Sequence, residues 1–410
     1  MADIATIVLQ VVSIFILGFG VRLVAVHSEN IVYPVALVLI GVTVAFTPFE
    51  LGISLSRDFI MIGFLPILLF QGAAELELGQ VRDLPLAPLA MVFVGLPLTA
   101  GIIGLAGSWL FDIPLLIALL FGAIIAPTDP AAVLAVFQQL EAPADLETII
   151  KSESVFNDTV SIVLFTVLLD LVLTQQETGN AVTQVTGVDT VVRLLVEMLI
   201  VGGGGLLVGA VVGFGVYGVT RVITDRMATL LLTVIAAYGS YIVASQFLGI
   251  SGVLAAVTAG LVIGHTGKWD TRPSETVLFM KGVWQTAVFL INTLIYILIG
   301  ELITPGTVFE YVWLIVGAAV LVLVARILVV YPTMGGINQL IADPLPIQYQ
   351  HVIVWGSLHT VIPVALALSL PEGMPFYEEI RTMVFGVAVL SVGVQGLLMP
   401  AVLKLTGISN

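Results

Sequence analysis

The amino-acid sequence predicts an all-α polytopic membrane protein with about 13 transmembrane helices. Of its residues, 59% are hydrophobic and only 10% are charged, and the mean hydropathy is +1.16. A soluble globular protein carries about 25% charged residues, so most of this chain must face lipid or other helices. The apolar runs are continuous and lack the alternation of barrel strands, which indicates helices.

Apolar windows long enough to cross a membrane follow one another along the whole chain. A spanning helix needs roughly 20 apolar residues, because the hydrocarbon core is about 30 Å thick. Connectors are short, and we therefore expect a single transmembrane domain over residues 1–410 with no soluble tail. The windows lie at 4–26, 31–49, 58–79, 84–111, 114–138, 148–175, 190–219, 227–247, 250–266, 275–301, 309–332, 350–370 and 380–404.

The distribution of Lys and Arg predicts the orientation in the plasma membrane. Most of the basic residues between these windows fall on one side, and fewer fall on the other. The positive-inside rule then places the C-terminus in the cytoplasm and the N-terminus outside. The first residues, "MADIATIVLQ", lack a basic region and a cleavage site, so we expect no removed signal peptide.

Charge and cysteine content exclude several classes of function. The chain has no cysteine, which excludes disulfides, thiolate metal sites and a cysteine nucleophile. The net charge of -14 predicts an acidic solvated surface and argues against a nucleic-acid partner, which requires a basic face. No motif for a cofactor is present, and we expect none.

Two of the predicted spans contain residues that break helices. In "FGAIIAPTDPAAVLAVF" (121–137), Pro127 and Pro130 flank Asp129, which suits a helix N-cap. In "WGSLHTVIPVALALSLP" (355–371), Gly356 and Pro363 predict a second break. These spans are seven apart, and the odd offset gives them opposite orientations. The sequence thus predicts an inverted repeat of 1–175 and 227–410 joined by a linker helix at 190–219.

Ionisable residues inside the predicted spans are candidates for function, because each is costly to place in a membrane. Glu153 and Asn157 are four apart and share a helix face, and Arg326 is the expected partner of Glu153, since a buried unpaired guanidinium is very unfavourable. We expect Lys281 to reach the surface and Asn292 to bond a neighbouring helix. The remaining candidates are Asp129, Asp158 and His359.

Asp158 is the candidate that a structural role explains least well. Arg326 is already used by Glu153, and the neighbouring Asn157 offers a carbonyl oxygen to a hard cation. A carboxylate removed from water can hold either a proton or a small cation. Such competition, together with alternating exposure of the site, predicts exchange of the two.

Several motifs in order along the chain resemble one family. They are "YPVALVLIGV" (33–42), "LPILLFQGA" (65–73), "APTDP" (126–130), "SESVFNDTVSIVLF" (152–165), "NTLIYILIG" (292–300), Arg326, "WGSL" (355–358) and "ALALSLP" (365–371). The set is similar to that of the NhaP/NHE-type sodium/proton antiporters of the cation/proton antiporter superfamily.

The resemblance implies an NhaA/NhaP-like fold, a homodimer and elevator-type alternating access, with sodium or lithium and protons as substrates and lipid as the surroundings. By position, Asp158 resembles the carboxylate that exchanges proton and cation, and Glu153 with Arg326 resembles its supporting ion pair. Asn157 beside Asp158 implies electroneutral one-for-one exchange. Further sodium ligands implied by position are Thr128, Asp129 and Ser154.

The chain departs from the family pattern at two positions. Gln71 stands where members often have an acid, and His359 where they usually have an arginine. His359 then either senses pH, because its charge can change in the physiological range, or bonds carbonyls freed by the second break. A potassium/proton antiporter of the same fold is an alternative. An intramembrane aspartyl protease is more remote, since neither Gly-x-Gly-Asp nor Pro-Ala-Leu occurs.

Overall fold

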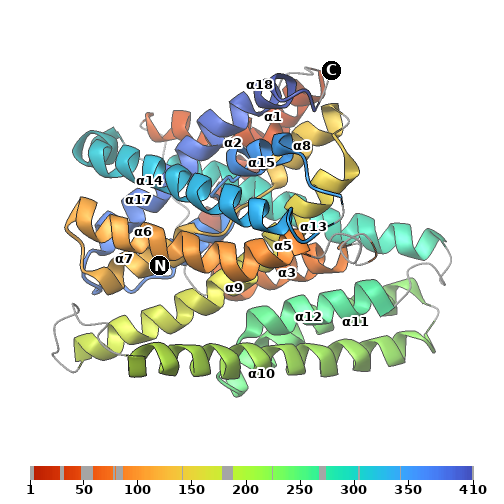
Figure 1. Ribbon diagram of the computed structural model, residues 1–410. Coiled ribbons are helices and arrows are strands. Elements are labelled where there is room, and N and C mark those ends of the chain that lie inside the picture. The colour runs from red at the N-terminus through yellow and green to blue at the C-terminus, as the bar shows by residue number, and fades with distance from the viewer. Residues whose placement is uncertain are drawn as a thin grey trace.

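The computed structural model describes residues 4–27, 32–47, 59–76, 79, 86–140, 142–177, 188–223, 225–266, 274–302, 305–341 and 343–408. This part of the chain is helical and contains no strand (Figure 1). The α-helices are α1 (Ile4–His27), α2 (Tyr33–Ala45), α3 (Leu65–Ala74), α5 (Leu86–Ala90), α6 (Leu96–Phe111), α7 (Leu115–Ile125), α8 (Ala131–Leu140), α9 (Ala144–Glu177), α10 (Val188–Thr220), α11 (Arg226–Ile242), α12 (Gly252–Thr266), α13 (Ser274–Glu301), α14 (Pro305–Ile337), α15 (Ile347–Trp355), α16 (Val361–Leu368), α17 (Tyr377–Leu390) and α18 (Leu397–Leu405).

The helices have the length and composition expected for a membrane protein. Eight stretches of the described chain are long and apolar enough to cross a bilayer, and shorter apolar helices lie between them. Large apolar side chains such as Phe19, Trp109 and Leu207 are exposed on the outer surface. The all-helical membrane fold is therefore confirmed, whereas thirteen crossings and the orientation remain predictions.

Both predicted helix breaks are present. Helix α7 ends at Ile125 and α8 begins at Ala131, so residues 126–130 are unwound. Helices α15 and α16 are separated in the same way by residues 356–360.

The sequence windows did not predict the π-helical turns inside several helices. Four such turns lie in the described residues, at Phe59–Phe64, Met91–Gly95, Val243–Phe247 and Ser391–Gly396. All but the turn at Val243–Phe247 are followed within four residues by a proline, namely Pro66, Pro97 or Pro400. Proline lacks an amide hydrogen and leaves the carbonyl of the preceding turn without its usual donor. The backbone widens at these places.

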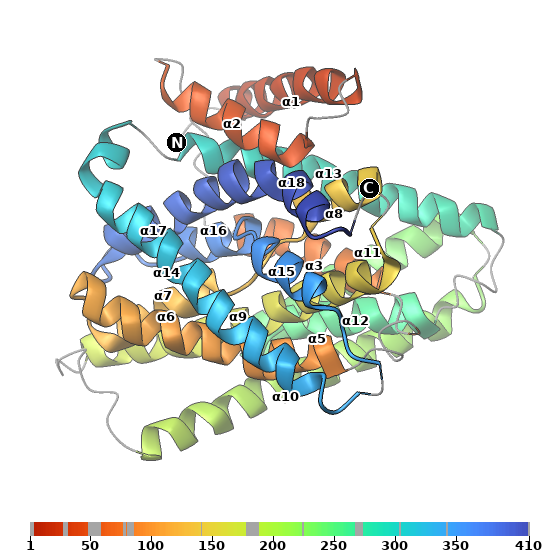
Figure 2. The same cartoon turned by 45° about the horizontal axis from the view of Figure 1, so that its top comes forward.

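The helices form two groups, and packing within each group is more extensive than packing between them. The first group contains α1, α2, α3 and α10 to α13, in which α2 packs on α13, and α12 packs on both α3 and α10. The second group contains α5 to α9 and α14 to α18, in which α7 packs on α6 and α9, and α14 packs on α17. Helices α10, α11 and α12 form a layer along one edge of the molecule, and Figure 2 shows α1 and α2 along another.

Glycines permit the closest helix contacts of the first group. A Cβ atom at Gly205 of α10 would lie 2.5 Å from the carbonyl oxygen of Ser251, and one at Gly300 of α13 would lie 2.3 Å from that of Val38. Both distances are shorter than any real contact, so a side chain would force these helices apart. In the run of glycines at 202–205, Gly202, Gly204 and Gly205 thus serve close packing, whereas a Cβ atom at Gly203 would meet nothing within 4 Å.

Candidate functional site

The two unwound segments cross each other, and their backbones are bonded at the crossing. The amide of Asp129 donates a hydrogen bond of 2.7 Å to the carbonyl oxygen of Leu358. On the neighbouring residues, Nδ1 of His359 lies 3.0 Å from the carbonyl oxygen of Pro127. Each break thus supplies groups that satisfy polar backbone atoms left free by the other.

The carboxylate of Asp129 is held by three donors at this crossing. Its Oδ1 accepts a bond of 2.9 Å from the amide of Ala131, as an N-cap side chain does at the start of a helix. Its Oδ2 accepts from the hydroxyl of Tyr296 at 2.6 Å and from the hydroxyl of Thr360. Asp129 is therefore a helix cap, and it is also tied to α13 and to the second break.

The predicted ion pair lies beside the crossing and is buried. The guanidinium of Arg326 on α14 donates to Oε1 of Glu153 on α9 at 2.7 Å, and each side chain is no more than 3% exposed. The same Oε1 accepts a bond of 3.1 Å from the amide nitrogen of Asn157. Nε of Arg326 donates to the hydroxyl of Ser357 at 2.7 Å. These bonds compensate the charges within a buried network.

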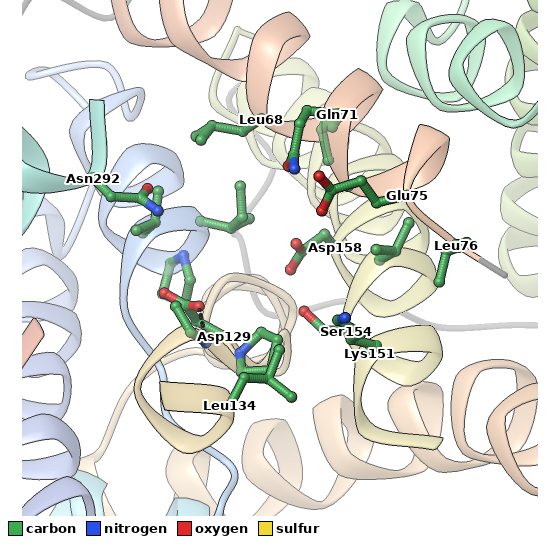
Figure 3. Close-up of a pocket in the computed structure, with 18 residues that line it drawn as sticks. Leu68, Gln71, Glu75, Leu76, Asp129, Leu134, Lys151, Ser154, Asp158 and Asn292 are labelled. Atoms are coloured by element: carbon green, nitrogen blue, oxygen red, sulfur yellow. Dashed lines mark hydrogen bonds between the residues drawn. The ribbon is translucent and has the colours of Figure 1, made fainter. Parts of the chain in front are cut away.

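Asp158 lies on another face of α9 and points into a cavity of about 210 Å³ (Figure 3). The Asp158 side chain is half-buried, and Ser154, one turn earlier on α9, lines the same cavity. Asp129 approaches from the break, and Gln71 and Glu75 approach from α3. Lys151, whose side chain is 42% exposed, lies where the cavity approaches the surface. Carboxylate and hydroxyl oxygens of this kind suit a hard cation or a proton.

Not all predicted ligands line this cavity. Asp129, Ser154 and Asp158 do, whereas Thr128 and Asn157 are buried beside it. Oδ1 of Asn157 has no hydrogen-bond partner within the described residues. His359 and Arg326 line a second, mainly apolar cavity of about 360 Å³ between α14, α15 and α17.

Two other sequence expectations concern single residues on α13. Lys281 is exposed, as expected for a side chain that reaches the surface. Asn292 lines the Asp158 cavity, which is a location that the expected helix-to-helix bond did not predict.

Tyr296, Thr360, Ser357 and Glu75 are polar residues of the site that the sequence analysis missed. Tyr296 stands in the apolar run "LIYILIG", where a tyrosine is typical of helix packing. A signal was nevertheless present, since Tyr296 follows Asn292 by one turn and shares its helix face.

Comparisons with known proteins agree with the motifs of the sequence. A family profile described as "Sodium/hydrogen exchanger, transmembrane" matches residues 11–405. The Na(+)/H(+) antiporter NhaG of Bacillus atrophaeus is 30% identical over 413 residues, which cover 97% of this chain and 76% of that relative. The Na(+)/H(+) antiporter NhaH of Halobacillus dabanensis is 32% identical over 382 residues, and the match covers 91% of each chain.

A solved structure shows the same fold. The sodium proton antiporter MjNhaP1 from Methanocaldococcus jannaschii at pH 8 superposes with a TM-score of 0.73, over 98% of this chain and 100% of that chain, at 19% sequence identity. The resemblance to NhaP-type antiporters that the motifs indicated is thereby confirmed. The chain belongs to the sodium/hydrogen exchanger family.

Proposed function

We propose that this protein is a secondary active antiporter that exchanges sodium or lithium for protons. The observation that carries the proposal is the contrast between two acids on α9. Glu153 is buried and paired with Arg326, whereas Asp158 faces a cavity beside the crossing of the two breaks. Asp158 is then the carboxylate free to take either a proton or a cation.

We infer that the cation is held by oxygen atoms from α9 and the first break. Asp158, Ser154 and Asp129 line the cavity and supply two carboxylates and a hydroxyl. Two further ligands are proposed: the buried hydroxyl of Thr128, and Oδ1 of Asn157, which has no hydrogen-bond partner among the residues that the structure describes. Sodium accepts such hard oxygen ligands, as other hard cations do.

The proposed cycle is an elevator movement of the second group of helices against the first, in a homodimer in the plasma membrane. The two groups share less packing with each other than within themselves, which supports relative movement. With the predicted orientation, α9 runs outward from the cytoplasm, and the end of the cavity near Lys151 faces the cytoplasm. The described state is then the inward-open one.

Exchange is tested with purified protein in liposomes that hold a pH gradient and a fluorescent pH indicator. We expect sodium and lithium to dissipate the gradient and potassium to leave it intact. A response to potassium of equal size would instead indicate the potassium/proton antiporter. No response to any of the three cations, with reconstituted protein verified, would contradict the proposed function. Empty liposomes and liposomes with Asp158→Asn are the controls.

A further inference from the structure

Most hydrogen bonds between side chains that are far apart in the sequence join helices of the same group, as helix packing does. In the first group, Tyr33 bonds Thr293 at 3.0 Å and Gln285 bonds Glu75 at 2.9 Å. In the second group, Arg326 bonds Glu153, and Trp355 bonds the carbonyl of Gln395. Such bonds hold each group together.

The bond between Tyr296 and Asp129 instead joins the two groups. Tyr296 belongs to α13 of the first group, whereas Asp129 lies in the break between α7 and α8 of the second group. The distance of 2.6 Å is typical of a hydroxyl that donates to a carboxylate. Tyr296 is 2% exposed, so water competes little for the bond. Any sliding of one group past the other must break it.

We propose that Tyr296 is a latch that holds the empty protein in the inward-open state and that cation binding at Asp129 releases it. The inference rests on the proposed function and adds a residue that couples the site to the movement. Tyr296 acts through Asp129 and is therefore a positioning residue.

The geometry of Asp129 explains why a cation would compete with Tyr296. A carboxylate oxygen offers about two lone-pair positions, and those of Oδ2 are taken by Tyr296 and Thr360. A cation that binds Oδ2 must displace one of these hydroxyls. Thr360 moves with Asp129 in the second group, and it can remain. Tyr296 is anchored in the first group, and its loss frees the two groups to move.

The test is sodium binding to the full-length protein, measured by isothermal titration calorimetry at pH 8 with Tyr296→Phe. This substitution removes the hydroxyl and keeps the ring. A cation no longer has to displace a donor, and we expect the dissociation constant for sodium to fall about tenfold, which corresponds to about 1.4 kcal/mol. The sodium KM of exchange in liposomes is expected to fall in the same direction.

Tyr33→Phe is the matched control. Its hydroxyl bonds Thr293 at 3.0 Å. Thr293 stands one turn before Tyr296 on α13, and this bond lies within the first group. We expect this variant to bind sodium as the wild type does. Thr360→Val supplies the contrast, because it also frees a position on Oδ2 but leaves the bond between Tyr296 and Asp129 in place. Whatever its sodium affinity, we expect its maleimide labelling without sodium, in the assay described below, to stay at the wild-type rate.

A second measurement reports the movement itself. The chain has no cysteine, so a single cysteine in place of Leu134 on α8, which lines the cavity, can be labelled by a maleimide from the predicted cytoplasmic side. In wild type we expect sodium to slow this labelling, because release lets the cavity close on that side. In Tyr296→Phe, labelling should be slow without sodium.

The latch is contradicted if Tyr296→Phe binds sodium as the wild type does or more weakly, or if Tyr33→Phe tightens binding equally. It is also contradicted if the labelling rate of Tyr296→Phe without sodium equals that of the sodium-free wild type. Failure of the wild type to exchange any cation would contradict the proposed function instead. The two failures are therefore distinguishable.

Discussion

The guanidinium of Arg326 meets the carboxylate of Glu153 at 2.7 Å, although the two residues lie 173 positions apart in the sequence. Ser357 and Asn157 complete the bonding of this pair, and both are buried. Through these bonds the pair joins α9, α14 and the second break beside the crossing. While it is intact, the pair holds α9 in place, and Asp158 on another face of α9 is held with it.

Replacement of Glu153 by leucine is expected to destabilise the protein strongly. Arg326 would be left as a buried charge without a partner, which costs about 3 to 5 kcal/mol. Thermal unfolding in detergent should show a clear decrease in Tm. The control is Glu147→Gln, which breaks the 3.0 Å pair with Lys151 on the same helix. Both partners of that pair are about one-third or more exposed, and its loss should cost about 1 kcal/mol or less. Equal losses of Tm in the two variants would contradict the supporting role of Glu153.

Asp158→Asn is expected to abolish exchange and leave a folded protein. The amide has nearly the shape of the carboxyl group, but it neither releases a proton nor neutralises a cation. Sodium-dependent proton flux in liposomes should fall to the level of empty liposomes, while the Tm should change little. Asp170→Asn, at an exposed position of the same helix, should keep wild-type flux. Substantial flux through Asp158→Asn would mean that another group exchanges the proton.

The helix breaks and the ion pair could be predicted from the sequence because their causes are local or strongly constrained. Pro127 and Pro130, three residues apart, remove backbone donors on both sides of Asp129, and this effect is local to the sequence. A buried Arg326 requires an acid, and Glu153 was available. The bond from Tyr296 to Asp129 depends on how two groups of helices meet, and the two residues are 167 positions apart. No helical periodicity reports such a contact. Gln71 and Glu75 were likewise brought to the cavity by the packing of α3 on its neighbours.

Exchange is expected to be electroneutral, because one carboxylate carries either one proton or one sodium ion in each direction. Glu153 stays paired with Arg326, and Asn157 carries no charge. Initial rates in liposomes should therefore not change when a membrane potential is imposed with potassium and valinomycin. Proton flux corrected for empty liposomes is the measurement. A clear acceleration or slowing on imposing the potential would show that a second group changes its charge during the cycle.

His359 was expected either to sense pH or to bond freed backbone carbonyls, and its bond to Pro127 favours the second interpretation. The imidazole is 2% exposed, and its Nδ1 lies 3.0 Å from a carbonyl oxygen freed by the first break rather than by its own. A backbone carbonyl accepts a hydrogen bond, so Nδ1 carries the hydrogen whether or not the ring is charged. Other groups around the residue are the backbone of Ile125, which also bonds the imidazole, the guanidinium of Arg326 on the same cavity, and the hydroxyl of Ser391, which accepts from the His359 amide at 3.2 Å.

His359→Ala is therefore expected to lower activity by a similar factor at all pH values, since it loses the donor that holds Pro127, and His359→Gln is expected to lower it less, because the amide nitrogen of glutamine can donate in place of the imidazole. Sodium affinity measured from pH 5.5 to 8.5 should give profiles parallel to that of the wild type. A charged imidazole would instead repel the cation in acid, and His359→Gln would then retain activity to lower pH than the wild type. That shift would establish His359 as a pH sensor. Thr360→Ser, adjacent in the same break, controls for disturbance of the crossing, because it keeps a hydroxyl on Asp129 and should leave the pH profile unchanged.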